Sequence, residues 1–147
     1  MEKRDILLGL MGLPVGGRNL LMSPIQIMKA LFLLKMELGL SDSEFYRFEP
    51  YLYGPCSFEV YSDLENLIKE GLVVTIPSSS TWTYYRVTSK GSDKAEKILR
   101  IADEDLINEI IKVKKCVTSK SFLELLKYVY QRYPKYAENS IVNIEAV

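Results

Sequence analysis

Two carboxylates have the spacing best suited to chemistry in this sequence: Glu59 and Asp63, four residues apart in a segment with helical periodicity. At that spacing both side chains lie on one face of a helix, where they could share a proton or bind a magnesium ion. The chain contains no histidine, which removes imidazole bases and the Ser-His and Cys-His nucleophile pairs. Acid pairs on exposed helices are far more often solvated than catalytic. We therefore expect a protein that is not an enzyme, and we assign it no catalytic residue, no metal ligand and no cofactor.

The two cysteines, Cys56 and Cys116, are isolated in the sequence. They have neither the density of a disulfide-rich secreted domain nor the paired spacing of a zinc site. We expect both thiols to be reduced and partly buried.

The composition restricts the class of protein. Nearly half of the 147 residues are apolar, which suits one sizeable core and a single domain. The formal net charge is zero, so no global field draws the protein to nucleic acid or to an anionic membrane. No apolar run approaches the roughly 18 residues that span a bilayer, and the first residues show no signal-peptide pattern. We expect a cytoplasmic protein with no membrane association.

The segment from Tyr51 to Gly71 must position the two carboxylates. Its Gly54-Pro55 pair predicts a turn, since proline fixes φ and disfavours the α region in the residue before it. Ser57 is a candidate cap for a helix whose apolar residues recur every three or four positions and which stops at Gly71.

Apolar periodicity also predicts the other helices, over residues 3–11, 25–38, from 89 or 91 to 102, 103–115, and a last one that ends before Pro134. Thr88 is the predicted cap of the helix that ends at residue 102, and Thr118 or Ser119 is the predicted cap of the last helix. Ser23, Pro24 and Gln26 form a capping box at the start of the second helix. That helix is apolar almost all round, so it should be packed on several sides as the core helix.

The segments between the helices are shorter. Residues 45–53 are predicted to form an edge strand or ordered loop, and residues 72–76 and 82–87 a β-hairpin. Gly16 to Arg18 lack the pattern of a phosphate-binding loop and are predicted to form a simple loop. The last residues, 138–147, are expected to fray.

This order of elements is that of a winged helix-turn-helix: mainly α, with a small β-hairpin wing and additional C-terminal helices. We expect one domain over residues 1–147. Its parts are a winged-helix core (1–91), C-terminal helices (92–134) and a tail (135–147).

Several motifs resemble the Panacea (SocA-like antitoxin) superfamily and its YwgA-like winged-helix relatives. They are QIMKALFLL at residues 26–34, FxPYxYGPxSxEVxxDL at 48–64, GL at 71–72 and LxYVYxxYP at 126–134. YYRVTSKG at 84–91 is similar to the second wing strand and exit turn of many winged-helix regulators. The resemblance implies a small, non-enzymatic prokaryotic protein in regulation or defence, of a kind in which some members are antitoxins that bind a toxin protein.

A protein-binding surface is predicted beside the acidic helix. Tyrosine buries a large area at low entropic cost and is enriched at interfaces, and the helix adds negative charge. The predicted partner-binding residues are Tyr51, Tyr53, Glu59, Asp63 and Glu65, and a basic partner such as a toxin would suit them. The alternative is that the aromatic rings between residues 45 and 61 simply cover the core, with exposed rings counting for the interface.

A homodimeric DNA-binding transcriptional regulator is the alternative function. Carboxylates on the helix would repel phosphates, and of its outward residues only Asn66 offers a base-reading side chain. Phosphate contacts are more plausible from the wing and from the lysine run, although such a run is usually a solvated face. The candidate nucleic-acid contacts are Asn66, Arg86, Lys90, Lys112, Lys114 and Lys115.

Overall fold

The computed structural model describes residues 1–15, 21–79 and 82–143 of the chain. The helices in these ranges are α1 (Lys3–Gly12), α2 (Pro24–Leu38), α3 (Phe58–Lys69), α4 (Ser89–Ile101), α5 (Glu104–Thr118), α6 (Phe122–Arg132) and the short 3-10 helix η1 (Pro134–Ala137). The strands are β1 (Glu49–Tyr51), β2 (Gly54–Cys56), β3 (Val73–Ile76) and β4 (Tyr84–Val87). The mainly α layout with a β-hairpin is confirmed, and it is compatible with a winged helix. The Gly16–Arg18 loop lies outside the described residues.

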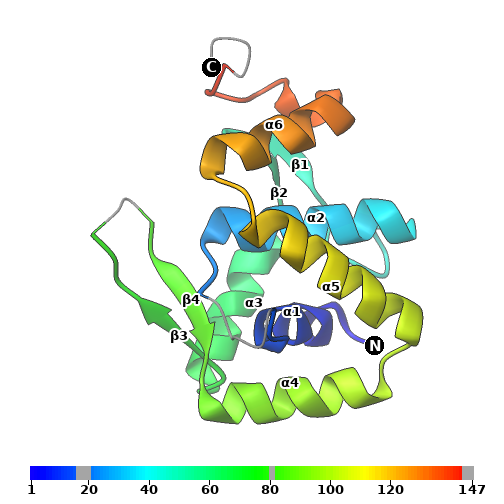
Figure 1. Ribbon diagram of the computed structural model, residues 1–147, viewed down its shortest axis with the longest axis vertical. Helices are drawn as coiled ribbons and strands as arrows, with labels where there is room; N and C mark the ends of the chain where they lie inside the picture. Colours follow the sequence, from blue (N-terminus) through cyan, green and yellow to red (C-terminus); the bar gives the residue numbers. More distant parts are fainter. Residues whose placement is uncertain (16–20, 80–81, 144–147) are drawn as a thin grey trace.

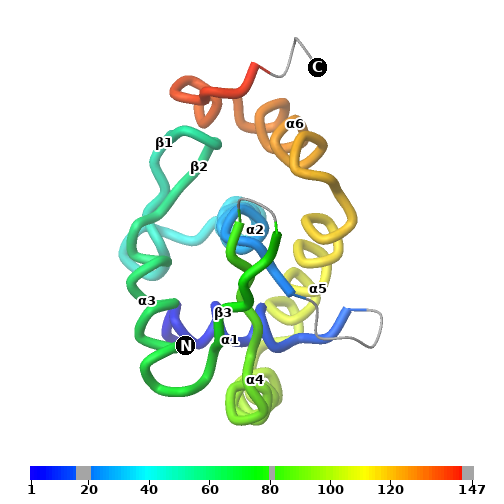
Figure 2. Tube along the Cα trace, turned by 90° about the vertical axis from the view of Figure 1, so that its left-hand side faces the viewer, coloured from blue at the N-terminus to red at the C-terminus, as the bar shows by residue number. Residues whose placement is uncertain are grey.

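Helix α2 runs through the middle of the molecule, with α5 packed along it and α1 packed on α4 (Figure 1). The β3–β4 hairpin extends from one side, while α6 and the β1–β2 hairpin lie at the end opposite α4 (Figures 1 and 2). The predicted core helix is confirmed, because ten of the fifteen α2 residues are buried. Its predicted capping box is also present, with Gln26 N–H donating to Ser23 Oγ at 3.1 Å and Ser23 N–H donating to Gln26 Oε1 at 2.9 Å.

The wing is attached to the start of α2. Strands β3 and β4 are antiparallel, with Val73 opposite Val87. Tyr85 of β4 also exchanges backbone hydrogen bonds of 2.8 and 3.1 Å with Met22, just before α2. As predicted, Thr88 caps α4 by accepting the N–H of Gly91 at 3.0 Å. The base of the wing is therefore fixed relative to α2.

The expected turn at Gly54-Pro55 is wrong. Both residues lie in β2, where Pro55 stands opposite Pro50, and the chain turns two residues earlier, at Leu52 and Tyr53. Gly54 has a positive φ of 92°, and a Cβ there would lie 2.7 Å from Cε1 of Tyr130. The glycine therefore permits the hairpin to approach α6, a contact that the local sequence does not encode.

The expected cap at Ser57 is also wrong. Its Oγ is buried and accepts no hydrogen bond from α3, while its backbone N–H points to Sδ of Met28 at 3.3 Å. The end of α3 is as predicted, because Gly71 adopts the left-handed conformation, with φ of 76°.

Helix α5 ends later than expected, and α6 begins later than expected. Helix α5 continues to Thr118, and Ser121, rather than Thr118 or Ser119, caps α6 through a capping box with Glu124. Residues 138–143, which we expected to fray, are held in place: Ile141 N–H donates to Leu52 O at 3.0 Å. The hydroxyl of Tyr130 donates to Ser140 Oγ at 2.7 Å. Residues 144–147 lie outside the described part of the chain.

The buried apolar side chains form a cluster contributed by every α-helix from α1 to α6. Leu64 and Leu67 on the inner face of α3 are both buried in it. None of the helices in the described residues has the length and apolar character needed to cross a membrane.

Candidate functional site: an aromatic pocket with a buried lysine

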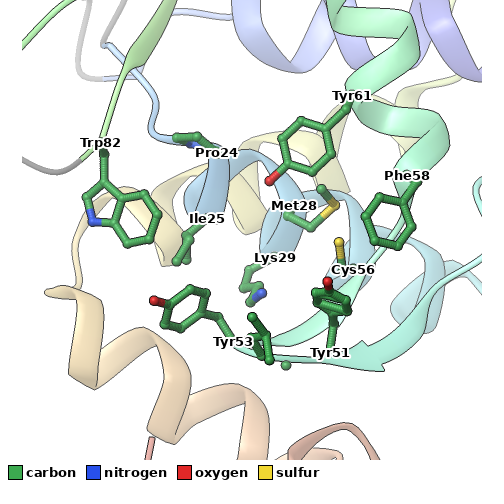
Figure 3. Close-up of a pocket in the computed structure, with 12 residues that line it drawn as sticks. Pro24, Ile25, Met28, Lys29, Tyr51, Tyr53, Cys56, Phe58, Tyr61 and Trp82 are labelled. Carbon is green, nitrogen blue, oxygen red and sulfur yellow. The ribbon is translucent and has the colours of Figure 1, made fainter. Parts of the chain in front are cut away.

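A pocket of about 200 Å³ lies between the start of α2, the β1–β2 hairpin, the start of α3 and the wing (Figure 3). Three stretches of the sequence, residues 24–29, residues 51–61 and Trp82, meet there. The lining residues are Pro24, Ile25, Met28, Lys29, Tyr51, Leu52, Tyr53, Gly54, Cys56, Phe58, Tyr61 and Trp82. The wall is thus almost entirely apolar or aromatic, which is the usual character of a ligand-binding cavity.

The rim of the pocket exposes large aromatic rings. Phe58 is 60% exposed, Tyr51 42% and Tyr61 41%. The rings of Tyr51 and Phe58 meet edge to face, with centroids 5.4 Å apart. Soluble domains normally keep rings of this size covered, so a group of exposed rings around a cavity marks an interaction site.

The wing contributes Trp82 to the same pocket. Its ring centroid lies 5.6 Å from that of Tyr53 and 6.0 Å from that of Phe122, the first residue of α6. Tyr53 also contacts Phe122, at 5.6 Å. This group of rings packs the wing strand and the hairpin turn against α6, and it closes one side of the cavity.

Lys29 reaches from α2 into the wall of the pocket between Tyr51 and Tyr53 (Figure 3). The residue is only 2% exposed, and its Nζ donates a hydrogen bond to the carbonyl oxygen of Pro55 at 3.1 Å. Burial lowers the pKa of this amine to about 7, while the neighbouring Cys56 opposes the shift slightly. A substantial fraction of Lys29 is therefore neutral at physiological pH.

Cys56 and Tyr61, which also line the pocket, stay protonated near pH 7. Burial raises the pKa of the Cys56 thiol and that of the Tyr61 hydroxyl. Among the lining residues there is no carboxylate that could neutralise a protonated Lys29. The site therefore offers one amine or ammonium, hydroxyl donors and a large apolar surface.

Sequence reasoning found part of this site. The predicted Tyr51 and Tyr53 both line the pocket, but Lys29 is not among the predicted site residues. The signal was present: a lysine in the middle of a helix that is apolar all round must be buried. No local pattern indicates that Trp82 reaches the same cavity.

The aromatic rings between residues 45 and 61 include some that cover the core and some that are exposed. Phe45, Tyr46 and Phe48 are buried and cover the core. Tyr51 is exposed, and so counts for an interface. The boundary between the two uses falls at the beginning of the β1–β2 hairpin.

The predicted acidic surface is largely occupied within the protein. Glu59 pairs with Lys3 of α1, which lowers the pKa of the Glu59 carboxyl. Asp63 accepts a hydrogen bond of 2.6 Å from the hydroxyl of Tyr46. Glu65 is exposed, with Lys69 at a distant 3.9 Å. Because Glu59 and Asp63 have separate partners, the arrangement does not pair them for acid-base chemistry.

The candidate nucleic-acid contacts do not form one surface. The prediction that Lys114 contacts nucleic acid is wrong. Lys114 is completely buried, and its amine donates to the carbonyl oxygens of Met11 at 3.0 Å and Leu13 at 2.5 Å. Lys112 lies 3.8 Å from carboxylate oxygens of both Glu37 and Glu109.

The remaining candidates are exposed but dispersed. Asn66 is on α3, Arg86 on β4 and Lys115 on α5, while Lys90 donates to the carbonyl oxygen of Glu70 at 3.1 Å. The wing and α5 lie on different sides of the molecule (Figure 1).

Cys56 and Cys116 are both free and half-buried, as predicted. In the described ranges, no three His, Cys, Asp or Glu side chains gather where they could hold a metal ion.

Comparison with known proteins gives no match, either to protein-family models or to curated proteins. The resemblance to Panacea proteins therefore stays a prediction.

Proposed function

We propose that this protein is a non-enzymatic regulatory module that binds a partner protein at the aromatic pocket. The observation that carries the proposal is the set of exposed rings, Tyr51, Phe58 and Tyr61, around a cavity of about 200 Å³. Interfaces gain most of their affinity from a few aromatic anchors and from pockets that accept a side chain of the partner. The rim and the cavity supply both features on one face.

The partner need not be basic. The expectation of a basic partner relied on Glu59, Asp63 and Glu65, and the first two are engaged by Lys3 and Tyr46. Apolar contact with the rim then contributes most of the affinity, with Glu65 as a peripheral charge.

A toxin remains the first partner to test. The motif at residues 48–64 that resembles Panacea antitoxins includes Tyr51, Tyr53 and Gly54, which all line the pocket. In an antitoxin-type role, these pocket residues would therefore bind the toxin.

Affinity capture followed by measurement on purified proteins tests the proposal. A partner retained by the wild-type protein is identified, purified and titrated by calorimetry against wild type and the double variant Phe58→Ala/Tyr61→Ala. Loss of two aromatic anchors should weaken binding by about tenfold or more. Ile101→Ala is the matched control, because this apolar side chain is 81% exposed at the far end of α4 and should leave the affinity unchanged.

Two outcomes would contradict the proposal. One is a partner that binds the rim variant as tightly as wild type. The other is site-specific binding to the DNA upstream of the protein's own gene, with a steep salt dependence and with specificity lost in Asn66→Ala, which would favour the DNA-binding regulator instead.

A further inference from the structure

We propose that the aromatic pocket binds an apolar carboxylate, with the carboxylate held by Nζ of Lys29 and the apolar group enclosed by the aromatic wall. The inference rests on the proposed function only in using the same pocket as the binding site. The carboxylate could belong to a small free acid or to the C-terminal residue of a partner chain. The recognition chemistry is the same in both cases.

The amine of Lys29 has hydrogen-bond donors that the described residues leave unused. Its Nζ is enclosed with the pocket on one side, and in the described part of the chain it makes one hydrogen bond, to Pro55 O at 3.1 Å. An ammonium group has three donors, so a protonated Lys29 still has hydrogen-bonding capacity to offer to the cavity. A carboxylate is an acceptor with two oxygens, which matches that need.

The electrostatics give the second step. No lining residue carries a negative charge, so burial disfavours the protonated amine and its pKa falls to about 7. A bound carboxylate supplies the missing counter-charge in a medium where ion pairs are poorly screened. Pro24, the first residue of α2, also lines the pocket, which places the positive end of that helix beside the ligand.

The shape of the cavity gives the third step. About 200 Å³ is enough for one aromatic or branched aliphatic group, and smaller than the pockets that hold drug-sized ligands. Figure 3 shows the rings of Tyr53, Phe58 and Tyr61 around this space, with the Tyr61 hydroxyl directed into it. Burial raises the pKa of that hydroxyl, so it stays protonated and can donate a second hydrogen bond to the carboxylate.

The inference makes a specific prediction about pH. Carboxylate binding favours protonated Lys29, so the pKa of Lys29 rises in the complex. Affinity should be highest below pH 7 and should fall as the pH rises through the free-state pKa of about 7. The groups that line the pocket with Lys29 from the other elements are Cys56, Tyr51, Tyr53 and Tyr61, and burial raises the pKa of Cys56 and of Tyr61.

Calorimetric titration of the purified protein with 3-phenylpropanoate tests the inference, with 3-phenylpropanamide as the uncharged control of the same shape. We expect the acid to bind at least about tenfold more tightly than the amide at pH 6.5 and to lose about tenfold in affinity at pH 8.5. Equal binding of acid and amide, or an acid affinity that does not change with pH, would overturn it.

Variants test whether Lys29 is the group that binds the carboxylate. Lys29→Met should abolish the preference for acid over amide, whereas Lys114→Met, which removes a buried lysine outside the pocket, should retain it. If Lys29→Met does not fold, the milder Tyr61→Phe removes only one donor and should reduce the preference for acid severalfold. Retention of the full preference in both pocket variants would place the anion elsewhere and overturn the inference.

Two further titrations separate the possible sources and the competing chemistry. A pentapeptide ending in Phe is compared with its C-terminally amidated form: tighter binding than 3-phenylpropanoate supports a chain terminus, and weaker binding supports a small acid. Borohydride trapping of 3-phenylpropanal on Lys29, together with no binding of the acid, would show an imine-forming amine and overturn the inference. These measurements need no partner protein, so they can fail while partner capture by the aromatic rim succeeds, and the reverse.

Discussion

Two of the three buried lysines in the described residues, Lys29 and Lys114, lie in regions that use them differently. At the end of α1, Lys114 of α5 donates to the carbonyl oxygens of Met11 and Leu13. At the aromatic pocket, Lys29 of α2 donates to the carbonyl oxygen of Pro55 and borders a cavity of about 200 Å³. Burial lowers the pKa of both amines, to about 8 for Lys114 and about 7 for Lys29.

A structural lysine and a binding lysine differ in the partners of their amines. Helix ends leave backbone carbonyls without partners, and a lysine that reaches them satisfies those carbonyls and its own donors together. Lys114 does this for α1, so its burial has a structural reason. Lys29 satisfies a single strand carbonyl and retains contact with a cavity, so its burial is better explained by a ligand.

The largest expected effect on stability comes from truncating an ordinary core side chain. Leu64 of α3 is buried in the core, so Leu64→Ala should lower the free energy of unfolding by about 2 to 5 kcal/mol. Urea denaturation monitored by circular dichroism measures the change. An unchanged unfolding midpoint would mean that the inner face of α3 has been assigned wrongly.

The pH dependence of stability should reveal both lysines. In the folded protein their pKa values are about 7 and about 8, below the value of 10.5 for an unperturbed lysine. The unfolded chain therefore binds more protons above pH 7, and stability rises with pH. We expect a gain of about 2 to 4 kcal/mol between pH 7 and pH 9, measured by urea denaturation at constant ionic strength. A stability that does not change with pH would show that the pKa of neither lysine is lowered in the folded protein.

Lys114→Met should destabilise the protein. The methionine fills the space of the lysine stem but leaves the carbonyl oxygens of Met11 and Leu13 without the amine. Unpaired buried acceptors are costly, and we expect a loss of about 1 to 3 kcal/mol at pH 7, partly offset by removal of the desolvated amine. Thermal and urea unfolding measure it, with Lys115→Met on the exposed face of α5 as the matched control.

Lys29→Met should have the smallest effect on stability, and of the opposite sign. It removes a desolvated amine and only one hydrogen bond, the one to the carbonyl oxygen of Pro55. We expect a gain of about 1 to 2 kcal/mol at pH 7, with a smaller rise in stability between pH 7 and pH 9. If Lys29→Met and Lys114→Met were equally destabilising, the distinction between the two lysines would break down.

The local sequence determined most of the elements. The capping box at Ser23 and Gln26, the Thr88 cap and the left-handed Gly71 stop are all present where the sequence predicts them. These signals depend on residues within one helical turn, so they act before any long-range contact forms. The hairpin wing also follows from a local pattern of β-rich runs around a polar tip.

The tertiary structure alone decided how the side chains are used. Glu59 and Asp63 carry the same charge on one helix, yet Lys3 takes one and Tyr46 takes the other. Lys29 and Lys114 both lie on helices, and only the packing of α1 and of the β1–β2 hairpin against those helices separates a structural cap from a pocket amine. Sequence periodicity fixes which face of a helix is buried, but the identity of the groups that meet there depends on contacts between distant segments, and those contacts determine desolvation, pairing and the remaining space.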